Sequence, residues 1–442
     1  MSEAGTGGAN RAPDGTRIVS VQGLARVEGE GSLRVEVRDG RVHDVELQIY
    51  EPPRFFEAFL RGRRAVEAPD LTARICGICP VAYQMSACAA VEDALDLSMG
   101  TGIADLRRLL YCGEWLQSHA LHVHMLHAPD FLGCQDAVEL ARIEGAAFER
   151  GLALKKLGNQ IMETVGGRAV HPINVRVGGF YRAPDRAEVA KLVGRLTDAV
   201  ESALAVVQWV SGFDFPDVES DYRFVALRQP GRYPMESGRV TSSDGIDVTA
   251  AGFADLVTEE HVARSTALHA HLEGGPPYLT GPLARYALNA AELPAPAAAA
   301  ARDAGLGDVC ANPFRSIVVR AVEMVVACHE ALALAERYEP PDPPSAVVPE
   351  RAGSGAGATE APRGLLLHTY EIDAEGLITD ARIVPPTSQN QIVIESDVRR
   401  AVEASLDLGD DELTWRSEQA VRNHDPCISC ATHFLDVKVH RS

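Results

Sequence analysis

Hydrophobic positions repeat at two different intervals along this chain, every second residue near the start and every third or fourth residue through the middle. Residues 17–50 alternate apolar and polar side chains, as in SLRVEVRDG and VHDVELQIY, with glycine-containing breaks between the runs. A period of two is typical of strands that bury one face. We therefore predict a small antiparallel sheet over 17–50.

Helical spacing dominates the region 54–338. Apolar residues recur at helical intervals over 80–97, 105–127, 136–165, 185–212, 253–271 and 313–338, with a more irregular, strand-containing stretch near 220–248. This pattern predicts a helical body whose centre is a bundle of long helices.

The C-terminal part changes composition. Residues 339–362 are rich in Pro, Gly and Ser and predict a surface loop. The runs GLLLHTYEID and LITDARIV then predict a hairpin, and 387–422 returns to helical spacing. We predict an α+β fold, mainly helical, with one interwoven domain over 17–433. Residues 1–16 are expected to form a disordered leader without the apolar core of a signal peptide, which favours the cytoplasm.

Composition and charge exclude several classes of protein. The chain is 46% hydrophobic and 24% charged, as expected for a packed globular fold. A net charge of -20 would repel nucleic acid and anionic membranes over most of the surface. No stretch approaches the roughly 20 apolar residues of a transmembrane helix, so we expect no membrane span.

Cysteine spacing carries the main chemical signal. Nine cysteines, an odd number, argue against a disulfide framework and favour free thiols or metal ligands. Two Cys-x-x-Cys pairs lie near opposite ends of the chain, Cys76 and Cys79 in RICGICP and Cys427 and Cys430 in DPCISC. Pro80 suits a first helical turn, which places the first pair at a helix entrance. The others are predicted core residues: Cys88, Cys112, Cys134, Cys310 and Cys328.

Four thiolates form a soft, electron-rich ligand set that suits zinc, iron–sulfur clusters, copper(I) or nickel. A structural zinc site is the simplest alternative, although zinc ribbons usually place their two pairs close together in sequence. A redox dithiol needs one pair only and leaves the second unexplained. Spacing alone leaves these alternatives open.

Longer stretches of sequence around the cysteines favour one kind of metal site over the others. RICGICP together with DPCISCATH resembles the two signature segments of the nickel-iron hydrogenase large subunit. Further segments follow that family's order: LARVEGEG, PPRFFEAFLRGR, LQSHALHVHMLHAPDFLG, GGRAVHP and EAPRG. The resemblance implies the family's fold and its activity, the reversible heterolytic cleavage of dihydrogen. The segments RFFEAF and DPCISCATHF are similar to those of the family's cytoplasmic, NAD(P)-linked branch.

The resemblance also implies a role for each cysteine of the two pairs. Nickel is held by all four thiolates, and Cys76 and Cys427 are its terminal ligands. Cys79 and Cys430 bridge nickel to an iron that carries carbon monoxide and cyanide. A terminal thiolate can then serve as the base that accepts a proton from dihydrogen.

Four more residues acquire roles around the metals from the same resemblance. Glu28 in ARVEGEG matches a proton-gate glutamate, and Arg363 in EAPRG matches an arginine above the open coordination position. Asp425 would orient the site, and His119 is the best candidate for a hydrogen bond to a bridging sulfur. Without the resemblance, Glu28 reads as a solvated strand-end residue, Arg363 as a loop arginine and Asp425 as a turn residue.

Glu57 in RFFE and His433 in CATH match the ligands of a magnesium ion, a donor pair that is unusual for magnesium on general grounds. The residues after His433, FLDVKVHRS, resemble an extension that a maturation protease removes after nickel insertion, so 434–442 is expected to be cleaved. Many members have an acidic residue where this chain has Ser118, which removes a carboxylate near the metals. A serine hydroxyl can still hydrogen-bond.

The resemblance implies partner proteins as well. No cysteine pair remains for an iron–sulfur cluster, so electrons are expected to leave through a small subunit that carries clusters. Flavin-containing NAD(P) diaphorase subunits are further expected partners, because the chain lacks a G-x-G-x-x-G fingerprint after a strand. The resemblance also implies nickel-insertion proteins. Two other classes of function remain, a structural zinc protein and a metal-free scaffold subunit of a quinone-reductase-like complex.

Overall fold

The computed structural model describes residues 7–11 and 16–432, and it confirms the N-terminal sheet. The strands are β1 (Gly7–Arg11), β2 (Arg17–Val21), β3 (Gly31–Arg38) and β4 (Arg41–Ile49), antiparallel and in that order. Apolar side chains of β2, β3 and β4 pack against two C-terminal helices in one buried cluster. Residues 7–11 pair with β2, so the predicted disordered leader is wrong there. Residues 1–6 and 12–15 lie outside the described residues.

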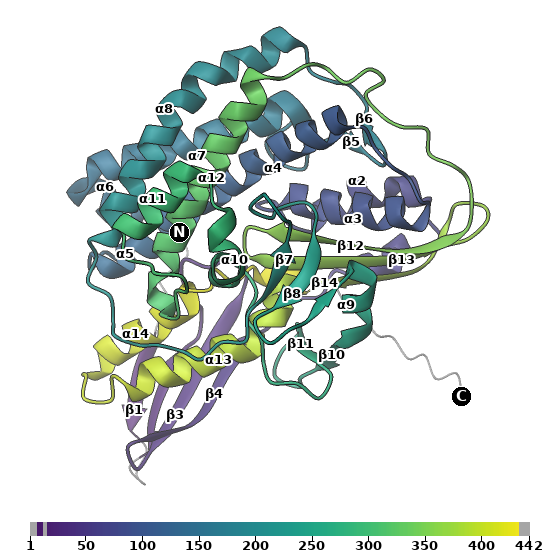
Figure 1. Ribbon diagram of the computed structural model, residues 1–442. Coiled ribbons are helices and arrows are strands. Elements are labelled where there is room, and N and C mark those ends of the chain that lie inside the picture. The colour runs from purple at the N-terminus through teal and green to yellow at the C-terminus, as the bar shows by residue number, and fades with distance from the viewer. Residues whose placement is uncertain (1–6, 12–15, 433–442) are drawn as a thin grey trace, which may run out of the picture.

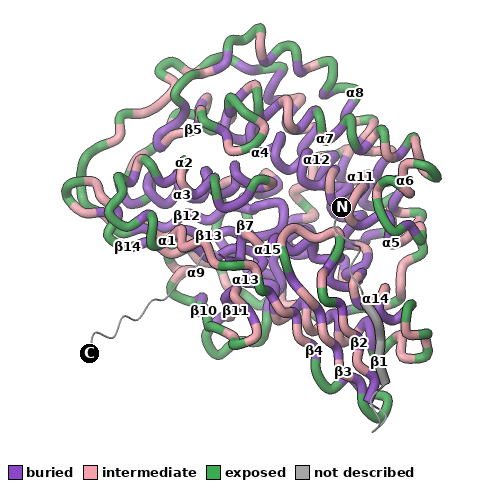
Figure 2. Tube along the Cα trace, turned by 180° about the vertical axis from the view of Figure 1, so that it is seen from behind, coloured by how far each residue is buried: buried purple, intermediate pink, exposed green. Residues whose placement is uncertain are grey.

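Long helices form the upper layer of the molecule (Figure 1). They are α4 (Thr101–Leu121), α7 (Gly145–Gly166), α8 (Arg186–Ser211) and α12 (Ser316–Glu336), with α3 (Pro80–Ala94) beneath them. Their inward residues are almost fully buried, and the buried parts of the chain run through the centre in Figure 2. This arrangement confirms the predicted bundle of long helices.

The remaining helices lie around this bundle and between the strands. In chain order they are α1 (Phe56–Leu60), α2 (Ala68–Thr72), a π-helix (His122–His127), α5 (Ala128–Phe131), α6 (Ala137–Ile143), α9 (Ala250–Leu256), α10 (Pro282–Asn289), α11 (Ala295–Asp303), α13 (Pro386–Glu403), α14 (Asp410–Arg422) and α15 (Ile428–Ala431). Short 3-10 turns cover Ala65–Glu67, Ala73–Ile75, Ala290–Glu292 and Pro313–Arg315. Within the described residues, no helix combines the length and the apolar composition that crossing a membrane requires.

The remaining strands form small antiparallel sheets. They are β5 (Val175–Arg176) with β6 (Gly179–Phe180), then β7 (Val225–Arg228), β8 (Arg239–Ser242) and β9 (Asp247–Val248), then β10 (Val257–His261) with β11 (Leu268–Leu272), and finally β12 (Gly353–Ala361), β13 (Gly364–Ile372) and β14 (Ile378–Val384). The β13–β14 hairpin confirms the prediction from GLLLHTYEID and LITDARIV.

One predicted helix differs from the structure. The helix predicted over 253–271 is wrong, because only α9 is helical and the rest is the β10–β11 hairpin. In β11 the apolar residues Leu268, Ala270 and Leu272 alternate with His269 and His271, which is the period of two expected for a strand. The helical spacing over 387–422 corresponds to two helices, α13 and α14, as the prediction of helices in this part allows.

The second half of the predicted surface loop 339–362 is the buried strand β12. The reason is close packing on α3. A Cβ atom on Gly353 would lie 2.0 Å from the carbonyl oxygen of Ala94, and one on Gly357 would lie 2.5 Å from that of Ser86. Glycines that read as loop residues therefore allow a strand to lie directly on a helix.

Candidate metal centre

Four cysteine sulfurs from opposite ends of the sequence form one buried cluster, and all of them lie within 4.8 Å of one another. The Sγ atoms of Cys76 and Cys427 are 3.5 Å apart, and those of Cys79 and Cys430 are also 3.5 Å apart. All four are buried free cysteines. Among the described residues, no other group of three or more His, Cys, Asp or Glu side chains has a metal-binding arrangement.

The start of α3 positions the first pair. Cys79 directly precedes the helix, and Pro80 is its first residue, as predicted. The buried carboxylate of Glu114, on α4, accepts hydrogen bonds from the backbone N–H groups of Val81 at 2.6 Å and Ala82 at 3.0 Å. These donors have no partner within the helix, so the carboxylate caps the helix entrance.

Contacts with distant segments position the second pair. The backbone N–H of Cys427 donates to Oγ1 of Thr387 at 2.9 Å, and that of Ile428 donates to the carbonyl oxygen of Glu28 at 3.0 Å. The guanidinium of Arg54 donates to the carbonyl oxygens of Ile75, at 2.7 Å, and of Ser429. Arg54 therefore ties the two cysteine segments together.

Glu28 lies directly against the sulfur cluster. Its Oε2 accepts hydrogen bonds from Sγ of Cys427 at 3.0 Å and from the backbone N–H of Ser429 at 3.1 Å. The side chain is only partly buried, so it contacts a buried thiol on one side and lies near solvent on the other. A carboxylate in this place can accept a proton from the Cys427 thiol.

Arg363 and Asp425 form a buried pair beside the cysteines. Nε of Arg363 donates to the carbonyl oxygen of Asp425 at 2.9 Å, and Nη2 donates to Oδ1 at 3.2 Å. Burial lowers the pKa of the Arg363 guanidinium, but the charges of Asp425 and the neighbouring cysteine sulfurs together outweigh burial and raise it above its usual value. Burial raises the pKa of the Asp425 carboxyl group. Asp425 thus fixes the direction of a cation next to the thiols.

The structure brings His119 to Glu323 rather than to a cysteine sulfur. Nε2 of His119 lies 3.0 Å from Oε2 of Glu323, and both side chains are fully buried. Burial lowers the pKa of His119, which favours the neutral ring. The hydroxyl of Ser118 is buried and has no hydrogen-bond partner within the described part of the chain.

Glu57 lies away from the sulfur cluster, in the wall of a cavity of about 890 Å³ between α1, β10 and β14. Its Oε1 accepts a hydrogen bond from the backbone N–H of Ile383 at 2.7 Å. The carbonyl oxygen of Thr432 accepts one from the N–H of Arg54 at 2.8 Å, so the last described residue lies near α1. His433, the other expected magnesium ligand, and the extension 434–442 lie outside the described residues.

The donor set fits nickel and iron. Hydrogen bonds with Cys427 and the other thiols lower the pKa of Cys76, whereas burial raises the pKa of Cys427. Several buried thiolates need a cation, and thiolate sulfur suits soft transition metals. Nη1 of Arg363 and the hydroxyl of Tyr83 are buried, with no hydrogen-bond partner among the described residues. Both polar atoms remain available to a group bound beside the sulfurs.

The sequence identified the cysteines, but it did not identify the residues that position the cysteine segments or the partner of His119. Glu114, Thr387, Arg54 and Glu323 reach the site from separate elements, and no local spacing marks them. The five remaining cysteines are buried, as predicted.

Comparisons with known proteins agree with this geometry. The sequence profile described as nickel-dependent hydrogenase matches residues 54–153 and 309–433. Sulfhydrogenase 1 subunit alpha of Pyrococcus furiosus is 31% identical over 94% of this chain and 98% of its own length. NAD-reducing hydrogenase HoxS subunit beta of Cupriavidus necator is 28% identical over 95% of each chain.

A solved structure shows the same fold. The crystal structure of an NAD+-reducing [NiFe]-hydrogenase in its H2-reduced state superposes with a TM-score of 0.84 and 28% identity, over 96% of this chain and all of that chain. The chain belongs to the nickel-dependent hydrogenase family. It is a large catalytic subunit, an oxidoreductase that acts on hydrogen.

Proposed function

We propose that this subunit catalyses the reversible heterolytic cleavage of dihydrogen and passes the electrons through partner subunits to NAD or NADP. The cluster of four buried cysteine sulfurs, with Glu28 on one side and Arg363 on another, carries the proposal. A structural zinc site would need neither a carboxylate against a thiol nor a buried arginine beside the sulfurs.

Within this proposal the cysteines divide into two kinds of ligand. Cys76 and Cys427 would hold nickel alone, and Cys79 and Cys430 would hold both nickel and an iron that carries carbon monoxide and cyanide. The bound metals supply the Lewis acidity and redox capacity for the cleavage. The residues that follow handle the proton and the local charge.

Glu28 receives the proton released at the Cys427 sulfur, because its Oε2 is 3.0 Å from that atom. Arg363 presents a fixed cation next to the reacting position, where it stabilises developing negative charge. Asp425 holds the guanidinium in one orientation through two hydrogen bonds. Glu28 therefore moves the proton, while Arg363 and Asp425 set the electrostatics.

The electron acceptor is proposed from the relatives. One curated relative is named an NAD-reducing hydrogenase, and the superposed crystal structure is that of an NAD+-reducing enzyme. We place this chain with such enzymes in the cytoplasm, with an iron–sulfur small subunit and a flavin-containing diaphorase as partners. The chain itself lacks a dinucleotide fingerprint after a strand.

We further propose a magnesium site formed by Glu57 and His433, and maturation by nickel-insertion proteins and a protease that removes 434–442. The position of Thr432 beside Arg54, three residues before Glu57, supports this site. A magnesium ion there would fasten the end of the mature chain to α1.

The test is the infrared spectrum of the complex purified from its own host. Carbon monoxide and cyanide stretches on iron are expected, together with one nickel per chain. Cys427→Ser should abolish these bands, hydrogen turnover and removal of the C-terminal peptide, whereas Cys328→Ser, a buried core cysteine, should retain all three. A protein that holds one zinc and shows no bands would make this a structural zinc site, and one without metal would make it a scaffold subunit.

A further inference from the structure

Arg363 lies at the tip of the β12–β13 hairpin, and this tip has an unusual backbone. Ala361 pairs with Gly364, so Pro362 and Arg363 alone form the turn. Two-residue hairpin turns usually need a positive φ in the turn, because that backbone matches the twist of the strands. Proline fixes its φ at about -65°, and Arg363 has no positive φ either. The positive φ falls instead on Gly364, at 141°, so the tip has a form that contacts outside the hairpin can support.

The helix α10 supplies that support. Nη1 of Arg285 donates to the carbonyl oxygen of Ala361 at 2.9 Å, and Nη2 donates to that of Pro362 at 3.0 Å. At the start of the same helix, a Cβ atom on Gly281 would lie 2.7 Å from the carbonyl oxygen of Arg363. Three consecutive carbonyl groups of the tip thus lie against α10.

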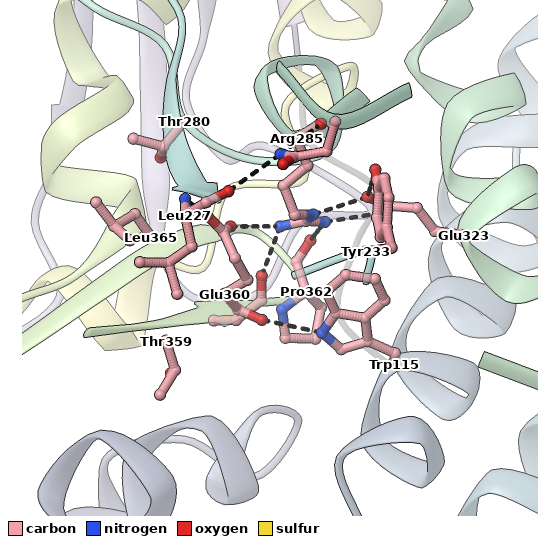
Figure 3. Close-up of polar contacts among 12 residues, drawn as sticks. Trp115, Leu227, Tyr233, Thr280, Arg285, Glu323, Thr359, Glu360, Pro362 and Leu365 are labelled. Carbon is pink, nitrogen blue, oxygen red and sulfur yellow. Dashed lines mark hydrogen bonds and ion pairs between the residues drawn. The ribbon is translucent and has the colours of Figure 1, made fainter. Parts of the chain in front are cut away.

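Arg285 is itself held rigidly (Figure 3). Its Nε and Nη2 bind the two carboxylate oxygens of Glu323, each at 2.7 Å, and Nη1 lies 3.1 Å from Oε2 of Glu360. Its guanidinium carbon is 4.5 Å from the ring centroid of Trp115. Burial raises the pKa of Glu323, but the charge and hydrogen bonds of Arg285, together with the contact from His119, outweigh burial and lower that pKa to about 2, so the pair stays ionised. The arginine cannot turn away without taking its positive charge from a buried carboxylate.

We propose that Arg285 is a positioning residue for the hydrogenase reaction, because its planar fork fixes the hairpin tip and hence the Arg363 guanidinium beside the cysteine cluster. The importance of Arg363 for turnover rests on the function proposed above, whereas the anchoring of the tip does not. A lysine at 285 would keep a positive charge beside Glu323, but a single ammonium cannot reproduce the fork that reaches two carbonyl groups and two carboxylates.

A double-mutant cycle on the purified holo complex tests whether Arg285 acts through Arg363. Arg285→Lys should lower kcat by about 100-fold, the effect of moving a reacting group by roughly an ångström. In an Arg363→Lys background the same change should lower kcat by less than about threefold, because the group that it positions is already gone. Equal effects in both backgrounds would overturn the proposal. Arg107→Lys is the matched control, a buried arginine bound to both oxygens of Glu92 and, among the described residues, without a hydrogen bond to the hairpin tip.

Hydrogen exchange gives a readout that does not depend on activity. In Arg285→Lys, peptides that cover the hairpin tip at 359–366 should exchange faster than in the wild type, while peptides of α12 should not change. Unchanged exchange at the tip would overturn the positioning role even in an active enzyme. If exchange at the tip rises in Arg285→Lys but the wild-type complex shows no hydrogen activity, the proposed function is overturned and the anchoring of the tip stands.

A second variant covers the case in which Arg285→Lys does not fold. Arg285→Gln combined with Glu323→Gln removes the fork and leaves no unpaired charge between these two positions. It is expected to show the same faster exchange at the tip. A tip as protected as in the wild type would again overturn the proposal.

Discussion

At the scale of single residues, the centre depends on contacts between positions far apart in sequence. Glu28 and Cys427 lie near opposite ends of the chain, yet their backbones form a bridge and their side chains hydrogen-bond. The same carboxylate also accepts from the backbone N–H of Ser429. Glu28 therefore holds the second cysteine segment as well as contacting a ligand sulfur, and a substitution must separate these two roles.

Glu28→Gln is expected to separate them. The amide oxygen can still accept from the Ser429 N–H, so metal content should be unchanged, but glutamine cannot take up a proton. Loss of a proton acceptor costs about 100-fold or more in turnover. Hydrogen turnover and nickel content are measured on the same preparation, with Glu30→Gln, an exposed neighbour, as control. Wild-type turnover in Glu28→Gln would move the proton route to another residue.

The sequence was sufficient to predict the cysteines of the cluster, and the contact between Glu28 and Cys427 fits the expected proton gate. The sequence was not sufficient to predict the roles of Arg285 and Glu323. Their roles come from α10 and α12 meeting a hairpin tip, and nothing in the local sequence marks that meeting. Charged side chains are rarely buried, and no sequence pattern marks these two as exceptions.

At the scale of elements, the spacing of apolar residues does not always predict the type of helix that forms, because packing against other elements also determines it. The predicted helix over 105–127 ends as a π-helix over His122–His127. Its changed pitch lets Nε2 of His122 contact the carbonyl oxygen of Arg422 at 2.9 Å, and Nε2 of His127 contact Oδ1 of Asn423 at 2.9 Å. Apolar spacing does not distinguish a π-helix from an α-helix, because the difference covers only a single turn.

The helix α13 anchors the same C-terminal segment through Asp397. Its carboxylate accepts from Ser220 Oγ at 2.8 Å and lies 2.9 Å from Nε2 of His424, and Tyr222 also donates to it. Asp397→Asn should destabilise the fold by about 3 kcal/mol, because it breaks a buried ionic network. The melting temperature measures this loss, with Asp380→Asn, in an exposed ion pair, as control.

The dependence on pH follows from the same carboxylate. Burial raises the pKa of Asp397, but the contacts with His424 and the hydrogen bonds from Tyr222 and Ser220 together outweigh burial and lower it below its usual value. A lowered pKa in the folded state gives stability that is present above the unfolded pKa and lost as pH falls through the folded pKa. The difference in melting temperature between wild type and Asp397→Asn should therefore be full at neutral pH and shrink below about pH 4. A difference independent of pH would contradict the ionised form.

At the scale of the whole molecule, the cysteine centre lies close to one apolar part of the surface. Val170 and Ile173 are each 50% exposed, and Cγ1 of Val170 lies 3.9 Å from where a Cβ of Gly77 would be, between the first two cysteines. Nδ1 of His171 contacts the carbonyl oxygen of Ala73 at 2.7 Å, which fixes this segment against the turn before Cys76. Electrons leaving the centre have a short path here, so we expect the small subunit to cover these residues.

Ile173→Asp tests that expectation, because it puts a charge where apolar surface would be buried without changing the cysteines. The dissociation constant of the two subunits should rise at least about tenfold, as for a central interface residue. Val138→Asp is the control, since Val138 is 61% exposed on α6, at the other end of the helical layer from β5 (Figure 1). Native mass spectrometry of the mixed subunits measures both. If the two variants associate equally well, the small subunit binds another face, and electrons must leave the cysteine centre by a different path.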